Sequence, residues 1–97
     1  MSSFDTVIDM ATGDERPPVP TGLTGTGLRI AVVRSSWNSE IVDRLMEGTE
    51  RALLALDASI AERISVPGCF EIPIACRALA LSGEVATIIA IGTVIRG

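Results

Sequence analysis

The stretch LRIAVVR at residues 28–34 decides the fold, because it is rich in β-branched residues, of strand length and apolar at almost every position. A strand that is apolar on both sides suits a sheet covered on both faces, as parallel sheets with packed helices are. We therefore predict that residues 28–34 form the first strand of an α/β domain.

The residues after this strand predict an amphipathic helix from residue 39 to about residue 56. Its apolar face consists of Ile41, Val42, Leu45, Ala52, Leu53 and Leu56, and charged residues occupy the opposing face. Asn38 and Ser39 are both favourable N-cap residues, so the helix is expected to begin there. Stabilising i,i+4 ion pairs are predicted at Glu40–Arg44 and Glu47–Arg51.

A second strand, a second helix and a third strand complete the pattern. AERISV at residues 61–66 predicts a strand of mixed polarity, closed by a Pro-Gly turn. The helix is predicted over residues 71–81, with Pro73 tolerated in its first turn. VATIIAIG at residues 85–92 is the most hydrophobic of the three strands. Right-handed crossovers on this β-α-β-α-β order give a parallel sheet with helices on its faces.

The composition excludes several classes of function. The chain has 97 residues, enough for one domain, and it contains neither lysine nor histidine, so no lysine-based chemistry can come from it. A net charge of −4 without a basic cluster argues against nucleic acid or an anionic membrane as a partner. Cys69 and Cys76 are too few for a four-ligand zinc site, so we expect no metal and reduced, largely buried thiols.

Residues 1–26 are predicted to form an N-terminal arm, because they have neither helical nor strand periodicity. Acidic residues stand where an export signal would have basic ones, and no apolar segment follows them. The longest apolar run, VATIIAIGTVI, is far shorter than the ~20 residues that a membrane span requires. The sequence therefore indicates a soluble cytoplasmic protein.

A binding site is expected at the carboxyl ends of the strands, where open parallel sheets bind their ligands. Three segments follow the strands at that edge, and they are SSWN, PGCFE and GTVIRG. Each contains a residue that is unusual in a plain connection, namely Trp37, Phe70 beside an acid, and Thr93 in an apolar run. This coincidence predicts that the three segments form one site.

Each candidate also has a purely structural interpretation. Trp37 could roof the core, Phe70 could belong to the core, and Asn38 could serve only as an N-cap. Glu71 could do no more than complement the helix macrodipole, and Arg96 could be a solvated charge.

Taken together, the segments GTGLRIAVV, SSWNSEIVDRLMEGTERAL, ISVPGCFEIPIACRALA and AIGTVIRG resemble lumazine synthase over about residues 25–97. The resemblance implies a flavodoxin-like three-layer α/β/α fold with a parallel sheet, here truncated to β-α-β-α-β. Residues 27–97 would be the N-terminal portion of that domain. It also implies a homopentamer, or a capsid of 60 subunits, with active sites between neighbouring subunits.

The same resemblance implies a transferase of riboflavin biosynthesis. Its substrates would be 5-amino-6-(D-ribitylamino)uracil and 3,4-dihydroxy-2-butanone 4-phosphate, with no metal and no organic cofactor. The substrate-binding residues would be Trp37, Asn38, Cys69, Phe70, Glu71, Thr93, Val94 and Ile95. Trp37 would stack on the pyrimidine ring, Glu71 would accept hydrogen bonds from ribityl hydroxyls, and residues 93–95 would hold the ring edge largely through backbone groups.

The chain also departs from the family pattern. The family histidine for proton transfer and the donors for the phosphate follow the IRG motif, so they are expected beyond Gly97, and an arginine that clamps the phosphate lies further on. We therefore expect no catalytic residue within residues 1–97, and an inactive chain when it is alone. Cys69 stands where a small residue is common. The alternatives are a non-catalytic flavin- or pterin-like binding module, an assembly module, and the related archaeal type of riboflavin synthase.

Overall fold

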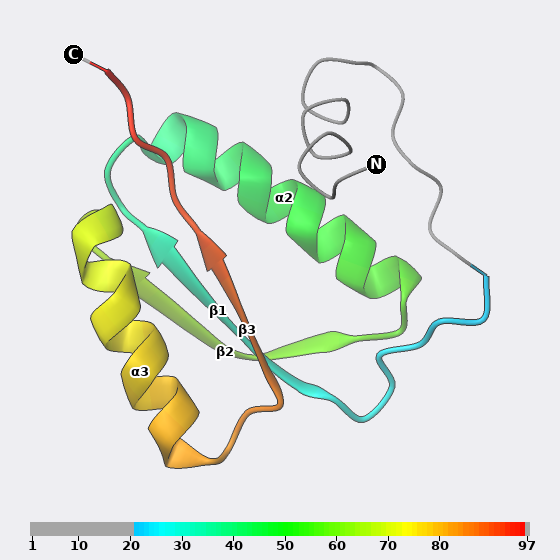
Figure 1. Ribbon diagram of the computed structural model, residues 1–97. Helices are drawn as coiled ribbons and strands as arrows, with labels where there is room; N and C mark the ends of the chain where they lie inside the picture. Colours follow the sequence, from blue (N-terminus) through cyan, green and yellow to red (C-terminus); the bar gives the residue numbers. More distant parts are fainter. Residues whose placement is uncertain (1–20, 97) are drawn as a thin grey trace, which may run out of the picture.

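The computed structural model describes residues 21–96, so residues 1–20 of the predicted arm and Gly97, the last residue of the predicted domain portion, lie outside the described residues. The elements follow the predicted order of strand, helix, strand, helix and strand, with a short 3-10 turn before the second helix (Figure 1). They are β1 (Arg29–Ser35), α2 (Ser39–Ala55), β2 (Ser59–Val66), η1 (Cys69–Glu71), α3 (Ile72–Ser82) and β3 (Thr87–Ile91). In the described part of the chain, no helix is long and apolar enough to cross a membrane.

The three strands form one parallel sheet in the order β2-β1-β3, which confirms the predicted α/β class. Ile30 of β1 pairs with Ile60 on one side and with Thr87 on the other. The register with β2 shifts between Ile30 and Ala31, so the two strands regain alignment after one irregular position. The strand predicted to be covered on both faces is therefore the central one.

The two helices lie on opposite faces of the sheet, as Figure 1 shows, and β1 contributes side chains to both faces. Alternation along a strand sends successive side chains to opposite sides. One core cluster consists of Val32, Val42, Met46 and Ile91, and the other consists of Ala31, Val33 and Leu79. Complete burial of a valine side chain contributes about 1.5–3 kcal/mol, so the apolar run of β1 holds both layers together.

Helix α2 begins where it was predicted, but its N-cap differs from the expectation. Asn38 has φ 60° and ψ 42°, and its side chain makes no capping hydrogen bond. Side-chain capping needs an extended cap residue, whose oxygen can reach the free N–H groups of the first turn. Here the Asn38 carbonyl accepts from the N–H groups of Ile41 and Val42 at 3.0 and 3.1 Å.

The predicted ion pairs along α2 are wrong. Within the described residues, the two ion pairs join the helix to the sheet instead, as Arg34–Asp43 and Arg63–Glu50. Asp43 and Glu50 lie two turns apart on one side of α2, where they reach arginines of β1 and β2. Exposed pairs within one helix gain little over hydration, so the side chains at those positions stay solvated.

The second strand begins at Ser59, two residues earlier than predicted, and the third is limited to Thr87–Ile91. Both cysteines are free and half-buried rather than largely buried. Cys76 packs against the cluster under α3.

Candidate functional site

The three segments predicted to form a site do come together. In Figure 1 the segment after β3 runs past the loop between β1 and α2, at the carboxyl end of the sheet. A cavity of about 200 Å³ lies there, and it is lined by Ser35, Trp37, Asn38, Gly68, Cys69, Phe70, Thr93, Val94 and Ile95. Seven of the eight residues predicted from the sequence line this cavity, and Glu71 is the one that does not.

The loop that carries Trp37 is fixed to the loop after β2 by backbone hydrogen bonds. The N–H of Ser36 donates to the carbonyl of Val66 at 2.7 Å, and the N–H of Trp37 donates to that of Pro67 at 3.0 Å. The two loops therefore form one wall of the cavity and are joined by main-chain hydrogen bonds.

The indole of Trp37 packs against Gly68. A Cβ atom at position 68 would lie 2.8 Å from Cε3 of Trp37, so the ring occupies space that any side chain would need. Trp37 is nevertheless 65% exposed, which rules out the interpretation that it roofs the core. One part of the ring is supported by backbone, and the rest is available to a flat ligand.

The interpretation of Phe70 as a core residue is also wrong, because Phe70 is 94% exposed. It belongs to η1, a single turn whose residues are not fully buried and which extends beyond the end of the sheet. Phe70 contributes to the rim of the cavity instead.

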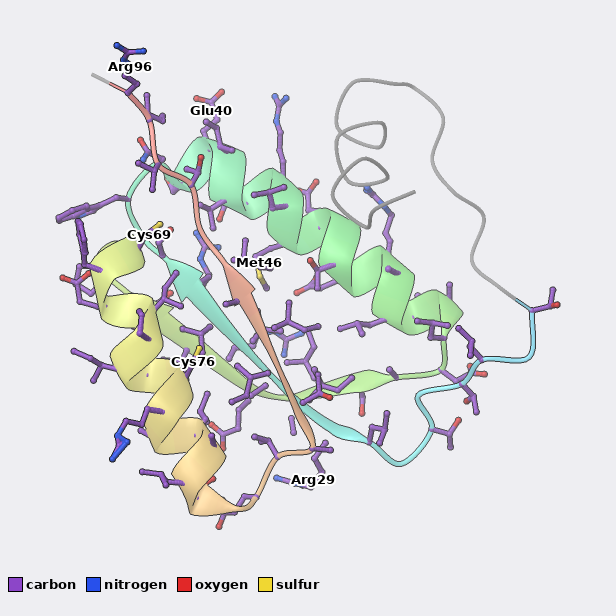
Figure 2. All side chains as sticks on the ribbon, viewed as in Figure 1. Arg29, Glu40, Met46, Cys69, Cys76 and Arg96 are labelled. Carbon is purple, nitrogen blue, oxygen red and sulfur yellow. The ribbon has the colours of Figure 1, made fainter. Side chains whose placement is uncertain are left out.

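Cys69 connects the segment after β2 to the segment after β3. Its thiol donates to the carbonyl of Thr93 at 3.4 Å, and Figure 2 shows Cys69 at the start of the second helical segment, beside the chain that leaves β3. Cys69 can lie this close to the segment after β3 because position 92 is glycine. A Cβ atom at position 92 would lie 2.6 Å from Sγ of Cys69. The segment carrying Thr93, Val94 and Ile95 is thereby held against the loop after β2.

Glu71 is half-buried, and its carboxylate is directed to its own loop. Oε2 accepts a hydrogen bond from the N–H of Gly68 at 3.0 Å, and the N–H of Glu71 donates to the carbonyl of Gly68 at 3.2 Å. The side chain therefore does more than complement a helix dipole, because it braces the glycine under Trp37. One oxygen of the carboxylate has this role, and a carboxylate has a second oxygen that can accept hydrogen bonds.

Sequence reasoning did not single out Ser35 or Gly68. Ser35 is 1% exposed, and its hydroxyl has no hydrogen-bond partner in the described part of the chain. The signal that could have found it is a hydroxyl at the end of an apolar strand, on the face shared by Ala31 and Val33. Gly68 could have been found as the residue between a proline and the helical turn.

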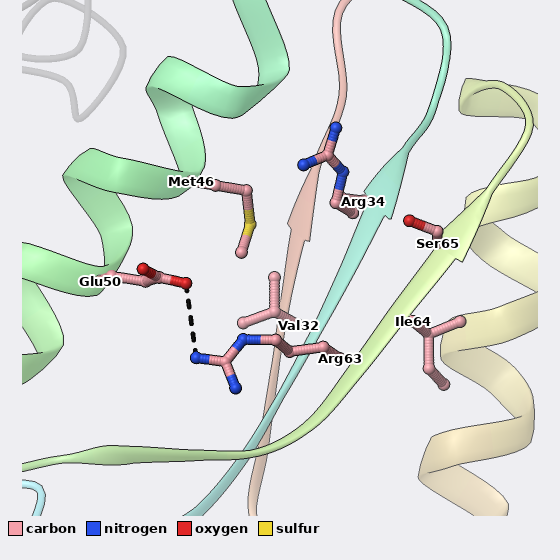
Figure 3. Close-up of a pocket in the computed structure, with 7 residues that line it drawn as sticks. All are labelled: Val32, Arg34, Met46, Glu50, Arg63, Ile64 and Ser65. Atoms are coloured by element: carbon pink, nitrogen blue, oxygen red, sulfur yellow. Dashed lines mark hydrogen bonds and ion pairs between the residues drawn. The ribbon is translucent and has the colours of Figure 1, made fainter. Parts of the chain in front are cut away.

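A second cavity, of about 370 Å³, lies between α2 and the sheet and is drawn in Figure 3. Arg34 and Arg63 both border it, but Arg63 donates to Glu50 at 3.4 Å and Arg34 pairs with Asp43. Both positive charges are thus matched locally, so the cavity offers an anion no uncompensated cation. Among residues 21–96, no group of three or more His, Cys, Asp and Glu side chains is arranged to hold a metal ion.

Comparison with known proteins shows the family of the chain. The family model described as 6,7-dimethyl-8-ribityllumazine synthase matches residues 27–97. A protein of that name from Kineococcus radiotolerans is 42% identical over 86 residues, which are 89% of this chain and 52% of the relative. Its namesake from Kocuria rhizophila is 43% identical over 77 residues, 79% of this chain and 48% of the relative. The chain thus spans about half the length of the curated relatives that it matches.

Proposed function

Because the chain belongs to the 6,7-dimethyl-8-ribityllumazine synthase family, we propose that it forms the ring-binding half of a lumazine synthase active site. The protein would condense 5-amino-6-(D-ribitylamino)uracil with 3,4-dihydroxy-2-butanone 4-phosphate. The observation that carries this proposal is the cavity at the carboxyl end of the sheet, where a supported indole meets the backbone after β3.

The shape of the cavity favours a flat heterocycle. Trp37 offers an open aromatic surface, and stacking on such a ring costs little conformational entropy. The volume of about 200 Å³ is below the roughly 300–1,000 Å³ of most ligand pockets. That size suits one ring of a larger ligand, with the remaining contacts supplied by residues outside this chain or by a neighbouring copy.

Roles for the other residues follow from their positions. Glu71 would accept hydrogen bonds from ribityl hydroxyls with the oxygen that does not bind Gly68. Asn38 would offer its amide, which no capping bond engages, and residues 93–95 would contact the ring edge largely through backbone groups. Cys69 and Phe70 would complete the walls.

In the proposed reaction, an amine of the uracil condenses with the ketone of the second substrate. Formation of this imine releases water, inorganic phosphate then leaves, and closure of the second ring releases another water. The residues named above would contribute by holding the two substrates in register, which is a large part of the barrier for a bimolecular step. Phosphate binding and proton transfer would come from segments that follow Gly97 in the family pattern, and their assignment stays a prediction.

We also propose a homopentamer, or a shell of 60 subunits, acting in the cytoplasm. Large apolar side chains along η1 and α3 support an assembly, because Phe70, Ile74 and Leu81 are 94%, 72% and 71% exposed. Large apolar side chains that are exposed together are typical of interfaces between proteins.

The test uses the full-length gene product beside residues 1–97. Each is incubated with both substrates, and formation of the lumazine is followed by absorbance. We expect the full-length protein to form product faster than the uncatalysed reaction and residues 1–97 to form none above it. A full-length protein that binds 6,7-dimethyl-8-ribityllumazine without forming it from the substrates would instead be a non-catalytic binding module.

A further inference from the structure

The hydroxyl of Ser35 is a buried polar group. Ser35 is the last residue of β1, is 1% exposed and lines the cavity beside Trp37. Among residues 21–96, its Oγ is the buried side-chain polar atom that has no hydrogen-bond partner. Nearly all such atoms in folded proteins are paired, because burial removes the hydrogen bonds that they make with water.

Two side chains that lie near Ser35 do not supply this bond. Around Gly92, three side-chain atoms converge on the place that a Cβ would occupy: Sγ of Cys69, Cδ1 of Ile72 and Oγ of Ser35 itself. The thiol of Cys69 already donates to the carbonyl of Thr93, and Ile72 is apolar. Ser35 also lines the cavity, so a polar group of a ligand bound there would lie beside this residue.

We propose that the Ser35 hydroxyl hydrogen-bonds a polar atom on the edge of the heterocycle that stacks on Trp37, and so acts as a positioning residue for the ring. This inference rests on the proposed function and adds a residue to the site. A hydroxyl can donate to a ring carbonyl or accept from a ring N–H, and both groups occur on a pyrimidine edge. Its burial also means that a ligand without such a group would leave it unpaired, which gives selectivity.

The experiment compares Ser35→Ala with Ser36→Ala in the full-length protein. Ser36 is the matched control, because it is the adjacent serine, is exposed and does not line the cavity. Affinity for 6,7-dimethyl-8-ribityllumazine is measured by calorimetry, and thermal unfolding is measured without ligand. We expect Ser35→Ala to bind about tenfold more weakly, which corresponds to about 1.4 kcal/mol. Its melting temperature should be unchanged or higher, because the variant removes an unpaired buried group.

These two opposite effects separate a positioning role from a structural one. If Ser35→Ala lowered both stability and affinity, the hydroxyl would be structural, bonded for instance to a fixed water, and the inference would be overturned. Equal affinity in wild type and Ser35→Ala would overturn it as well, while leaving the proposed function intact. A wild-type protein that did not bind the lumazine would overturn both.

Discussion

Replacing Gly68 by alanine should weaken ligand binding without weakening the fold. Gly68 has φ −139° and ψ −179°, an extended conformation that alanine adopts freely. The new methyl group, however, would lie 2.8 Å from Cε3 and 2.9 Å from Cζ3 of Trp37. Carbon atoms in contact sit about 3.5–4.0 Å apart, so the indole must retreat by roughly 1 Å. Trp37 can do so, because it lies on a loop and is 65% exposed.

The expected loss of affinity follows from the stacking contact between the ligand and the Trp37 ring that would be lost. Base stacking on an aromatic side chain is worth about 1–3 kcal/mol, so a displaced indole should reduce affinity for the ribitylaminouracil by about tenfold or more. The free energy of unfolding should change by less than about 1 kcal/mol, since a tolerated Gly→Ala change by itself stabilises by about 0.4–1 kcal/mol.

The assay measures affinity by calorimetry and stability by urea unfolding, in full-length protein. Gly48→Ala is the matched control, because Gly48 lies within α2 and a Cβ there meets only an arginine side-chain atom at 3.8 Å. It should stabilise by about 0.5–1 kcal/mol and leave affinity unchanged. Gly68→Ala is then combined with Trp37→Ala. Equal losses of affinity from Gly68→Ala with and without the indole would refute the reasoning, because the effect would not pass through Trp37.

Three further predictions concern single residues. Trp37→Ala should weaken binding of the ribitylaminouracil about tenfold or more and that of the butanone phosphate much less, and comparable losses for the two substrates in calorimetry would count against the stacking role. Glu71→Gln should lower affinity for the ribityl compound but cost at most about 1 kcal/mol of stability, because glutamine can still accept from the N–H of Gly68; a loss of stability with normal binding would make Glu71 a bracing residue only. Asp57→Gly should raise the free energy of unfolding by up to about 1 kcal/mol, since Asp57 has φ 57° and is exposed, and a lower midpoint in urea would show that its side chain makes a stabilising contact.

Much of the fold was predictable from local patterns. The continuous apolar run of β1 predicted a strand buried on both faces, and the helical spacing of apolar residues predicted α2, because both patterns reflect which side of an element leaves water. The convergence of residues 37, 70 and 93 followed from topology alone, since parallel strands bring their carboxyl ends to one edge.

The remaining features depend on contacts between distant segments. The acidic residues of α2 form ion pairs with Arg34 and Arg63 of the sheet rather than with arginines of the same helix. Sequence spacing predicts pairs within a helix, but it does not predict a partner on another element. Asn38 has a left-handed conformation and directly follows Ser36 and Trp37, whose N–H groups donate to the carbonyls of Val66 and Pro67. In the sequence, Ser35 is an ordinary residue for the end of a strand. Only the packing around it shows that its hydroxyl is buried without a hydrogen-bond partner.

The central position of β1 has a consequence for how the protein is made. Of the three strands, β1 is synthesised first, β2 about thirty residues later and β3 last. Both later strands pair directly with β1. Each new strand therefore adds to a free edge of a strand already synthesised, so the sheet can grow outward in the order of translation. Because Thr93, Val94 and Ile95 line the cavity and follow β3, the cavity is incomplete in the emerging chain until residue 95 has left the exit tunnel. A nascent chain halted earlier should hold a paired sheet and bind no heterocycle.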